Sequence, residues 1–312
     1  MPPPTASSPA PFPCGDLSVA ATADVAGDLI IKNFGGLARL IFVLFVPLHA
    51  AFLVAIFYLS PQSTLVGAVD YVIGMLTDPE ATMLAYDVRS QAVVLGLQFV
   101  YFLLNVLFVT PFTTGALTRA AVAAYLGQPL TAAAALRWAG KNLWRLVAAS
   151  LYAWLVIGGA TAATGLIFFL PVGAFFLVGD NLPAAFSVGV MLLALVGLSV
   201  AATAWLVASV KMMALYPALA AENCGAWDAA KRSARLTKSR VSRGLWLMFL
   251  GSVISIFPTA AINCIFNAGA LGVLSALAQG FALLITTAFA TVYYFSCRAA
   301  HENLDILLLV EK

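Results

Sequence analysis

Long apolar runs constrain this chain more than any other feature of its sequence. A helix needs about 20 apolar residues to cross the ~30 Å hydrocarbon core of a bilayer, and a soluble domain is roughly a quarter charged. Here 9% of the residues are charged and 62% are hydrophobic, and the alternating segments of about ten residues that mark a membrane β-barrel are absent. We therefore predict an all-α polytopic membrane protein in which six transmembrane helices form a single membrane domain over 17–310. The predicted spans are 37–59, 91–117, 146–178, 184–216, 244–266 and 271–296.

The N-terminal region differs from the rest of the chain in composition. Residues 1–16 are rich in proline and serine and contain no Lys or Arg. Because a signal peptide needs a basic start followed by an apolar stretch, we interpret this segment as a disordered tail. Residues 17–36 mix apolar side chains with Asp24 and Asp28, which predicts a short amphipathic helix at the membrane interface before the first span.

The positions of the basic residues predict the orientation of the spans. Lys and Arg bias a short loop toward the cytoplasm. With a cytoplasmic N-terminus, fifteen of the sixteen Lys and Arg residues fall on the cytoplasmic side, and only Arg89 falls outside. The segment 60–90, on the opposite side, carries Asp70, Asp78 and Glu80. We therefore expect both termini to be cytoplasmic.

Two stretches of the chain, 110–151 and 215–252, follow the same order of features. Each contains a proline, a helix of small residues, a glycine turn, a short basic helix and a tryptophan, Trp144 or Trp246, before the next span. We expect Thr131 and Asp228 to cap the two basic helices, because both residue types favour N-cap positions. The pattern predicts a weak internal two-fold repeat of parallel orientation.

The stretch from Lys231 to Arg243 holds six of the sixteen Lys and Arg residues. On a helix, Lys231, Arg235 and Lys238 form one stripe, and Arg232 and Arg243 flank it. Such a helix could lie beneath the inner leaflet, where each basic residue near an anionic surface is worth about 1 kcal/mol. Three other readings stay open: the charges only fix topology, they bind a specific phosphorylated ligand, or they dock a soluble partner. The candidate lipid-headgroup residues are Lys231, Arg232, Arg235, Lys238 and Arg243.

Three segments of the chain resemble one known family. The first is PALAAENCGAWDAAKRSARLTKSR, the second is TVYYFSCRAAHENLDILLL with Arg298, Glu302 and Asp305, and the third is VAGDLIIKNFGGLARL. They are similar to the membrane domain of the glycerophosphoryl diester phosphodiesterase type and to related bacterial inner-membrane proteins, over roughly 18–310. The resemblance implies a six-helix membrane module, often without assigned activity. The phosphodiesterase barrel of that enzyme, about 250 residues long, has no room in this chain.

Few residues within the predicted spans are candidates for a catalytic or ligand-binding role. His49 lies inside the first span, and intramembrane ionisable groups are candidates for function; with Asn105 and Asn263 it could line a mid-membrane polar cavity. Hydrogen bonding between helices explains these residues equally well. The pairs Arg298/Glu302 and His301/Asp305 are spaced as exposed helix pairs worth a few tenths of a kcal/mol. No motif frames a catalytic, metal or cofactor site, and the four cysteines lack metal-site spacing and predict free thiols.

The sequence therefore favours a non-enzymatic, multi-pass protein of the bacterial inner membrane that needs no cofactor. We expect it to engage anionic membrane lipids through its basic cytoplasmic helices, in envelope organisation or lipid handling. Nucleic acid is not an expected partner, and protein partners and homo-oligomers stay open. The alternative is a transporter or permease subunit whose cavity forms around His49, Asn105 and Asn263.

Overall fold

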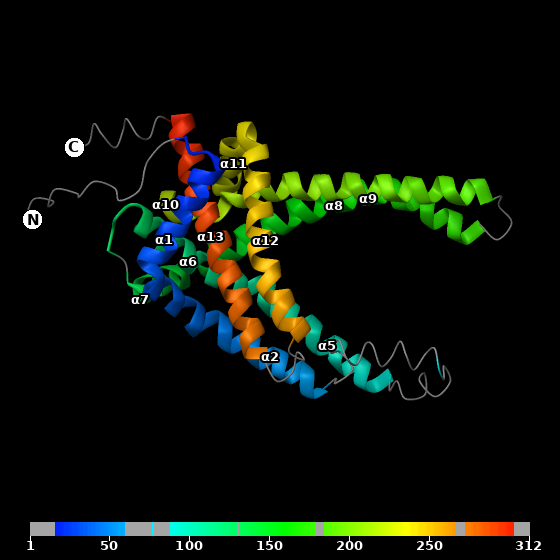
Figure 1. Cartoon of the computed structure of the whole chain (residues 1–312), viewed down its shortest axis with the longest axis horizontal. Coiled ribbons are helices and arrows are strands. Elements are labelled where there is room, and N and C mark those ends of the chain that lie inside the picture. Colours follow the sequence, from blue (N-terminus) through cyan, green and yellow to red (C-terminus); the bar gives the residue numbers. More distant parts are fainter. Residues whose placement is uncertain are drawn as a thin grey trace, which may run out of the picture.

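The computed structural model describes residues 16–59, 77, 88–129, 131–178, 184–265 and 272–302 (Figure 1). No strand occurs in this part of the chain. Two segments, η1 (Ile41–Phe45) and η3 (Asn105–Val109), are π-helical, and η5 (Lys238–Arg240) is a 3₁₀ turn. The α-helices are α1 (Val19–Leu40), α2 (Val46–Leu59), α5 (Val88–Leu104), α6 (Thr110–Tyr125), α7 (Ala132–Lys141), α8 (Leu143–Val178), α9 (Ala184–Met213), α10 (Leu215–Glu222), α11 (Ala226–Thr237), α12 (Val241–Ile265) and α13 (Gly272–Glu302).

Six helical stretches in the described residues are long and apolar enough to cross a membrane. Many of their apolar side chains face outward: Leu155 is 72% exposed, Met191 69% and Phe257 70%. Lipid tails would cover these side chains, whereas water would not tolerate so large an apolar surface. This agrees with the predicted all-α, multi-pass membrane fold. The six stretches are Val19–Phe52, Leu95–Tyr125, Leu143–Ile167, Gly189–Glu222, Ala226–Phe257 and Ala276–Glu302.

Helix α13 is the central element of the bundle and packs against α1, α2, α6, α10, α11 and α12. Helix α1 lies along it in the opposite direction: the Leu17 amide donates to Ser296 Oγ at 2.9 Å, and Phe34 stacks on Phe281 with ring centroids 6.0 Å apart. The start of α1 therefore lies beside the end of α13, next to α11 and the start of α12 (Figure 1). We call this region the basic end. The α8–α9 hairpin projects away from the rest of the bundle (Figure 1).

The predicted interfacial helix over 17–36 corresponds to the first part of α1, and its position at the membrane interface stays a prediction. Helix α1 extends from Val19 to Leu40 and continues through η1 into α2. A kink at Asn33, whose φ −117° and ψ 16° are not helical, separates the first part of α1 from the stretch that leads into η1. The Asn33 amide group donates to the Leu29 carbonyl oxygen at 3.0 Å and so satisfies a backbone acceptor near the kink.

Both π-helical segments lie just before a proline inside a helix. Pro47 follows η1, and Pro111 follows η3. A proline in a helix interior lacks an N–H donor, and its ring collides with the carbonyl four residues earlier. A wider π turn moves that carbonyl away, and π-helices appear mostly as such single-turn insertions. The two prolines therefore explain why these spans bend without breaking.

The two related stretches adopt the same order of elements: a helix, a left-handed turn residue, a short helix and the next span. Gly127 (φ 69°) follows α6, and Asn223 (φ 48°) follows α10. Thr131 caps α7 as predicted, accepting from the Ala134 amide at 3.3 Å. The predicted cap at Asp228 is wrong, because Gly225 is the N-cap of α11 and Asp228 lies in the first turn. The Asp228 carboxylate in the first turn still stabilises the helix, because it interacts favourably with the partial positive charge at the helix N-terminus. The duplication itself stays a prediction.

Replacing Gly244 with alanine should destabilise the protein, whereas the same replacement at Gly251, on the same helix, should not. A Cβ at position 244 would overlap the Val210 methyl group and lie 2.9 Å from the Tyr293 hydroxyl oxygen, and this hydroxyl is held by the Arg240 carbonyl oxygen at 2.9 Å. We expect Gly244→Ala to lower the free energy of unfolding by about 1–3 kcal/mol. At Gly251 the nearest atom would lie at 3.5 Å, so Gly251→Ala should be neutral or stabilising by up to ~1 kcal/mol.

Thermal denaturation of the two purified variants in the same detergent would measure the difference. Equal midpoints would show that α9, α12 and α13 do not approach one another as closely as the structure has them.

Candidate functional site

Three basic side chains form an exposed stripe at the basic end. Lys231 and Arg235 lie on α11, and Lys238 follows directly in η5. All three are exposed, and no carboxylate pairs with any of them within the described part of the chain. The Lys231 ammonium lies 4.9 Å from the ring centroid of Trp227, which is itself 54% exposed. The basic stripe (Lys231, Arg235 and Lys238) is thus positively charged and uncompensated.

The opposite face of α11 explains why this stripe points outward. The helix buries Ala230, Ser233 and Leu236, which recur at a spacing of three residues on one face. Ser233 Oγ donates to the Lys211 carbonyl oxygen of α9 at 2.6 Å. This bond and the small apolar residues hold α11 against α8, α9 and α13. The basic side chains are left on the far face.

Arg232, one of the predicted headgroup residues, instead pairs inside the protein. Its Nε lies 2.8 Å from Glu222 Oε1, and its Nη2 lies 2.5 Å from Glu302 Oε1. Arg298 Nε completes the group at 2.8 Å from Glu302 Oε2, and the Tyr294 hydroxyl donates to Glu222 Oε1 at 2.6 Å. We call Glu222, Arg232, Arg298 and Glu302 the Arg–Glu cluster. It joins α10, α11 and α13.

The Arg–Glu cluster corrects the expectation that Arg298 and Glu302 form an ordinary exposed pair. Their side chains are 25% and 23% exposed, and each also approaches a group from another helix. Asp305 lies outside the described residues, while His301 Nε2 lies 3.3 Å from the Ser239 hydroxyl. The i, i+4 spacing was visible in the sequence, but nothing in it showed that Glu222 and Arg232 would join the pair.

Arg243, another predicted headgroup residue, also has a protein partner. It pairs with Asp16 and donates to the Leu17 carbonyl oxygen at 2.7 Å. Arg240 Nη2 donates to Asp16 Oδ2 at 2.8 Å. Asp16, assigned to the disordered tail by sequence, is therefore fixed to the start of α12, while residues 1–15 lie outside the described part. The hydrogen bond from Arg240, with further contributions from Arg243, lowers the pKa of Asp16 from 3.8 to about 2.

Asp16 should make stability depend on pH in the acid range. Because its pKa is lower in the folded protein, its contribution is fully present above pH 3.8 and is lost as pH falls from 3.8 through about 2. The side chain is 47% exposed, so we expect Asp16→Asn to cost less than ~1 kcal/mol at pH 7. The difference in denaturation midpoint between wild type and variant should shrink between pH 4 and pH 2.

The matched control is Asp24→Asn, at an exposed position of α1 for which the structure gives no ion pair. Its effect at pH 7 should be smaller than that of Asp16→Asn. Equal effects of the two substitutions would contradict the pairing of Asp16.

His49 and Asn105, two of the three predicted cavity residues, meet between α2 and η3. Asn105 Nδ2 lies 3.4 Å from His49 Nε2 and 3.2 Å from the Tyr101 hydroxyl, and Thr110 donates to Asn105 Oδ1 at 2.6 Å. The His49 ring stacks on Phe45. These contacts fit hydrogen bonding between helices. The side chain of Asn263 lies outside the described residues.

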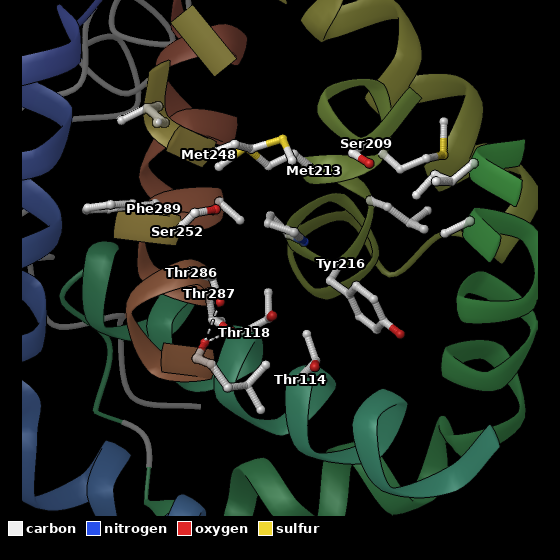
Figure 2. Close-up of a pocket in the computed structure, with 18 residues that line it drawn as sticks. Thr114, Thr118, Ser209, Met213, Tyr216, Met248, Ser252, Thr286, Thr287 and Phe289 are labelled. Carbon is white, nitrogen blue, oxygen red and sulfur yellow. Dashed lines mark hydrogen bonds between the residues drawn. The ribbon is translucent and has the colours of Figure 1, made fainter. Parts of the chain in front are cut away.

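A cavity of about 320 Å³ lies elsewhere, among α6, α8, α9, α10, α12 and α13. Neither His49 nor Asn105 is among its described lining residues. Figure 2 shows Thr114 and Thr118 of α6 on one side, Met213 and Met248 across from them, and Thr286 and Thr287 on α13. No motif in the sequence marked this site, because its residues come from six helices.

Neither the thiols nor the acidic groups suggest a metal or reactive centre. Within the described residues, no group of three or more His, Cys, Asp or Glu side chains could hold a metal ion. Cys224 and Cys297 are free thiols. Burial, followed by the nearby charge of Glu222, raises the pKa of Cys224, which favours its unreactive protonated form.

Comparison with known proteins adds no relative. No protein family, no curated protein and no solved structure matches this chain. The functional conclusion therefore rests on the residues and their geometry.

Proposed function

We propose that this chain is a non-enzymatic integral membrane protein that binds the headgroups of anionic lipids through its basic stripe. One observation carries the proposal: Lys231, Arg235 and Lys238 are exposed side by side and have no counter-ion in the described structure, although carboxylates pair with their neighbours Arg232, Arg240 and Arg243. Lipid phosphates would supply the missing negative charge, at about 1 kcal/mol for each basic residue.

We restrict the proposed headgroup-binding residues to three of the five that the sequence predicts. Arg232 and Arg243 already have carboxylate partners, and separating a partly buried ion pair leaves one charge without compensation. The exposed Trp227 ring next to Lys231 supports an interfacial position, because tryptophan is enriched at membrane surfaces. Trp144 and Trp246, 73% and 62% exposed at the starts of α8 and α12, fit the same level of the bilayer.

The proposal places the basic end at the cytoplasmic face of a bacterial inner membrane. The bias of Lys and Arg toward the cytoplasm supports this orientation. The resemblance to the glycerophosphoryl diester phosphodiesterase membrane domain supports a six-helix membrane module. Envelope organisation or lipid handling is the role that such binding would serve.

Removing the three charges of the basic stripe should weaken binding to anionic membranes. We expect Lys231→Ala/Arg235→Ala/Lys238→Ala to reduce the retention of phosphatidylglycerol, measured by native mass spectrometry of the detergent-solubilised full chain, by about tenfold or more. The triple variant should fold normally, since its side chains are exposed. Phosphatidylcholine retention should not change.

A matched control removes three exposed charges elsewhere. Arg39→Ala/Arg137→Ala/Lys141→Ala changes the net charge equally, at exposed positions of α1 and α7. This variant should retain phosphatidylglycerol as the wild type does. Equal losses in both triple variants would show that net charge alone governs retention, and unchanged retention in the stripe variant would refute the headgroup site.

A further inference from the structure

Close packing of helices does not explain the volume of the cavity among α6, α8, α9, α10, α12 and α13. Its volume of about 320 Å³ lies at the lower end of the ~300–1,000 Å³ range of ligand pockets. Well-packed protein interiors leave few voids larger than a water molecule. A partly open cavity of this size between helices is therefore a candidate binding site.

Three residues that line the cavity, Thr114, Thr118 and Tyr216, have a buried hydroxyl group without a hydrogen-bond partner. Thr114 and Thr118 lie one turn apart on α6, and the Oγ1 atoms of both are buried without a partner. The Thr118 side chain is 1% exposed. By contrast, Thr286 and Thr287 on α13 donate to carbonyl oxygens of their own helix. Leaving a buried hydroxyl unpaired costs about 1–3 kcal/mol, so an occupant that supplies hydrogen-bonding oxygens would be stabilised here.

The described lining residues disfavour a charged occupant. None of them is Asp, Glu, Lys, Arg or His, and burying an unpaired charge costs several kcal/mol or more. Three methionines, Met212, Met213 and Met248, lie in the wall, and their flexible side chains adapt to apolar ligands. Ser209 and Ser252 add hydroxyls from two further helices. Hydroxyls from three helices suit a ligand end that carries several oxygens.

An apolar groove lies beside this cavity, between α9 and α12. The groove, about 500 Å³ in volume, shares Met248 and Ser252 with the cavity. Its other apolar lining residues include Leu206, Leu245 and Phe249. Trp205 and Trp246, 46% and 62% exposed, also line it. Since these helices are long and apolar enough to span a membrane, the groove opens toward the lipid tails.

We propose that the cavity and groove together bind one neutral glycerolipid of the diacylglycerol class. Its uncharged glycerol-ester end lies in the cavity, where its oxygens bond the hydroxyls of Thr114 and Thr118, and an acyl chain lies in the groove. This site is separate from the basic stripe and needs no charged headgroup. The proposal therefore stands or falls independently of the proposed headgroup binding.

The test uses the full chain in nanodiscs with a diacylglycerol analogue that carries a photoactivatable acyl chain. Thr114→Val/Thr118→Val keeps the shape of both side chains but removes their unpaired hydroxyls, so the fold should be kept or stabilised. We expect this variant to bind dioleoylglycerol at least about tenfold more weakly. Label on the wild type should map to α9 and α12 around Met248.

The matched control is Thr113→Val. Thr113 Oγ1 is also buried without a partner, on the same helix, but it does not line the cavity. Its affinity for dioleoylglycerol should equal that of the wild type, and the basic-stripe triple variant should also bind normally. Any of three results would overturn the proposal: unchanged affinity in the double variant, label that maps away from the groove, or a preference for dioleoylphosphatidylglycerol or a quinone over dioleoylglycerol.

Discussion

Replacing Glu222 with glutamine should lower the free energy of unfolding by about 2 kcal/mol. Glu222 Oε1 accepts from Arg232 at 2.8 Å and from the Tyr294 hydroxyl at 2.6 Å, and Arg298 Nη1 lies 4.0 Å away. Removal of this one negative charge leaves two arginines sharing only Glu302. The cost of breaking a fully buried pair is ~3–5 kcal/mol, and we expect less here because the Glu222 side chain is 19% exposed.

The control for this prediction is Asp28→Asn. Asp28 pairs with Lys32 one turn away at 3.0 Å, but the two side chains are 59% and 57% exposed. An exposed helix pair contributes about 0.3–0.5 kcal/mol, so this variant should barely shift the denaturation midpoint. Similar losses for the two variants would show that the Arg–Glu cluster is no more than a set of surface ion pairs.

A double-mutant cycle would show whether the cluster acts as a unit. Combining Glu222→Gln with Arg232→Gln should cost less than the sum of the two single changes, by about 0.5 kcal/mol or more, because the residues share partners. Strict additivity would contradict the network. Chemical denaturation in mixed micelles, with both single variants and the double variant in the same conditions, provides the measurement.

Replacing Tyr125 with alanine should cost about 3–5 kcal/mol, a larger loss than for the cluster. Tyr125 ends α6, is fully buried and stacks on Phe295 of α13 with ring centroids 4.4 Å apart. Removing the ring leaves a void between α6 and α13. Thermal denaturation of the purified variant should give an unfolding midpoint well below that of the wild type.

Phe99→Ala provides the contrast, since Phe99 is 62% exposed on α5. In a bilayer, lipid tails cover this ring, and lipid can fill the space that alanine leaves. We expect a loss of less than ~0.5 kcal/mol. If Phe99→Ala were as costly as Tyr125→Ala, the outward face of α5 would be covered by protein, and the arrangement of that helix would need revision.

Hydropathy along the sequence does not distinguish side chains buried in protein from side chains that face lipid. Tyr125 and Phe99 lie in apolar helices of similar composition, yet one ring is buried in protein and the other faces outward. Lipid tails are as apolar as a protein interior, so the sequence pattern does not separate the two environments. For the same reason, the cavity between α6 and α12 could not be predicted, because its lining reads as ordinary membrane-span sequence.

The candidate site was partly predictable. The i, i+4, i+7 spacing of Lys231, Arg235 and Lys238 identified the exposed stripe, because periodicity along one helix depends only on local geometry. The flanking Arg232 and Arg243 were grouped with the stripe by proximity in sequence. Their partners Glu302 and Asp16 lie at opposite ends of the chain. Only the packing of α13 against α11, and of α1 against α12 and α13, brings these partners together.

The sequence alone determined the helical membrane class, the six spans and the Thr131 cap, because each depends on local composition or on a few adjacent residues. The tertiary structure alone decided which charges are neutralised, where a cavity remains, and that His49 meets Asn105. These features depend on which helix faces meet. Apolar faces are nearly interchangeable inside a membrane, so only close packing and a few long-range polar contacts select the partners.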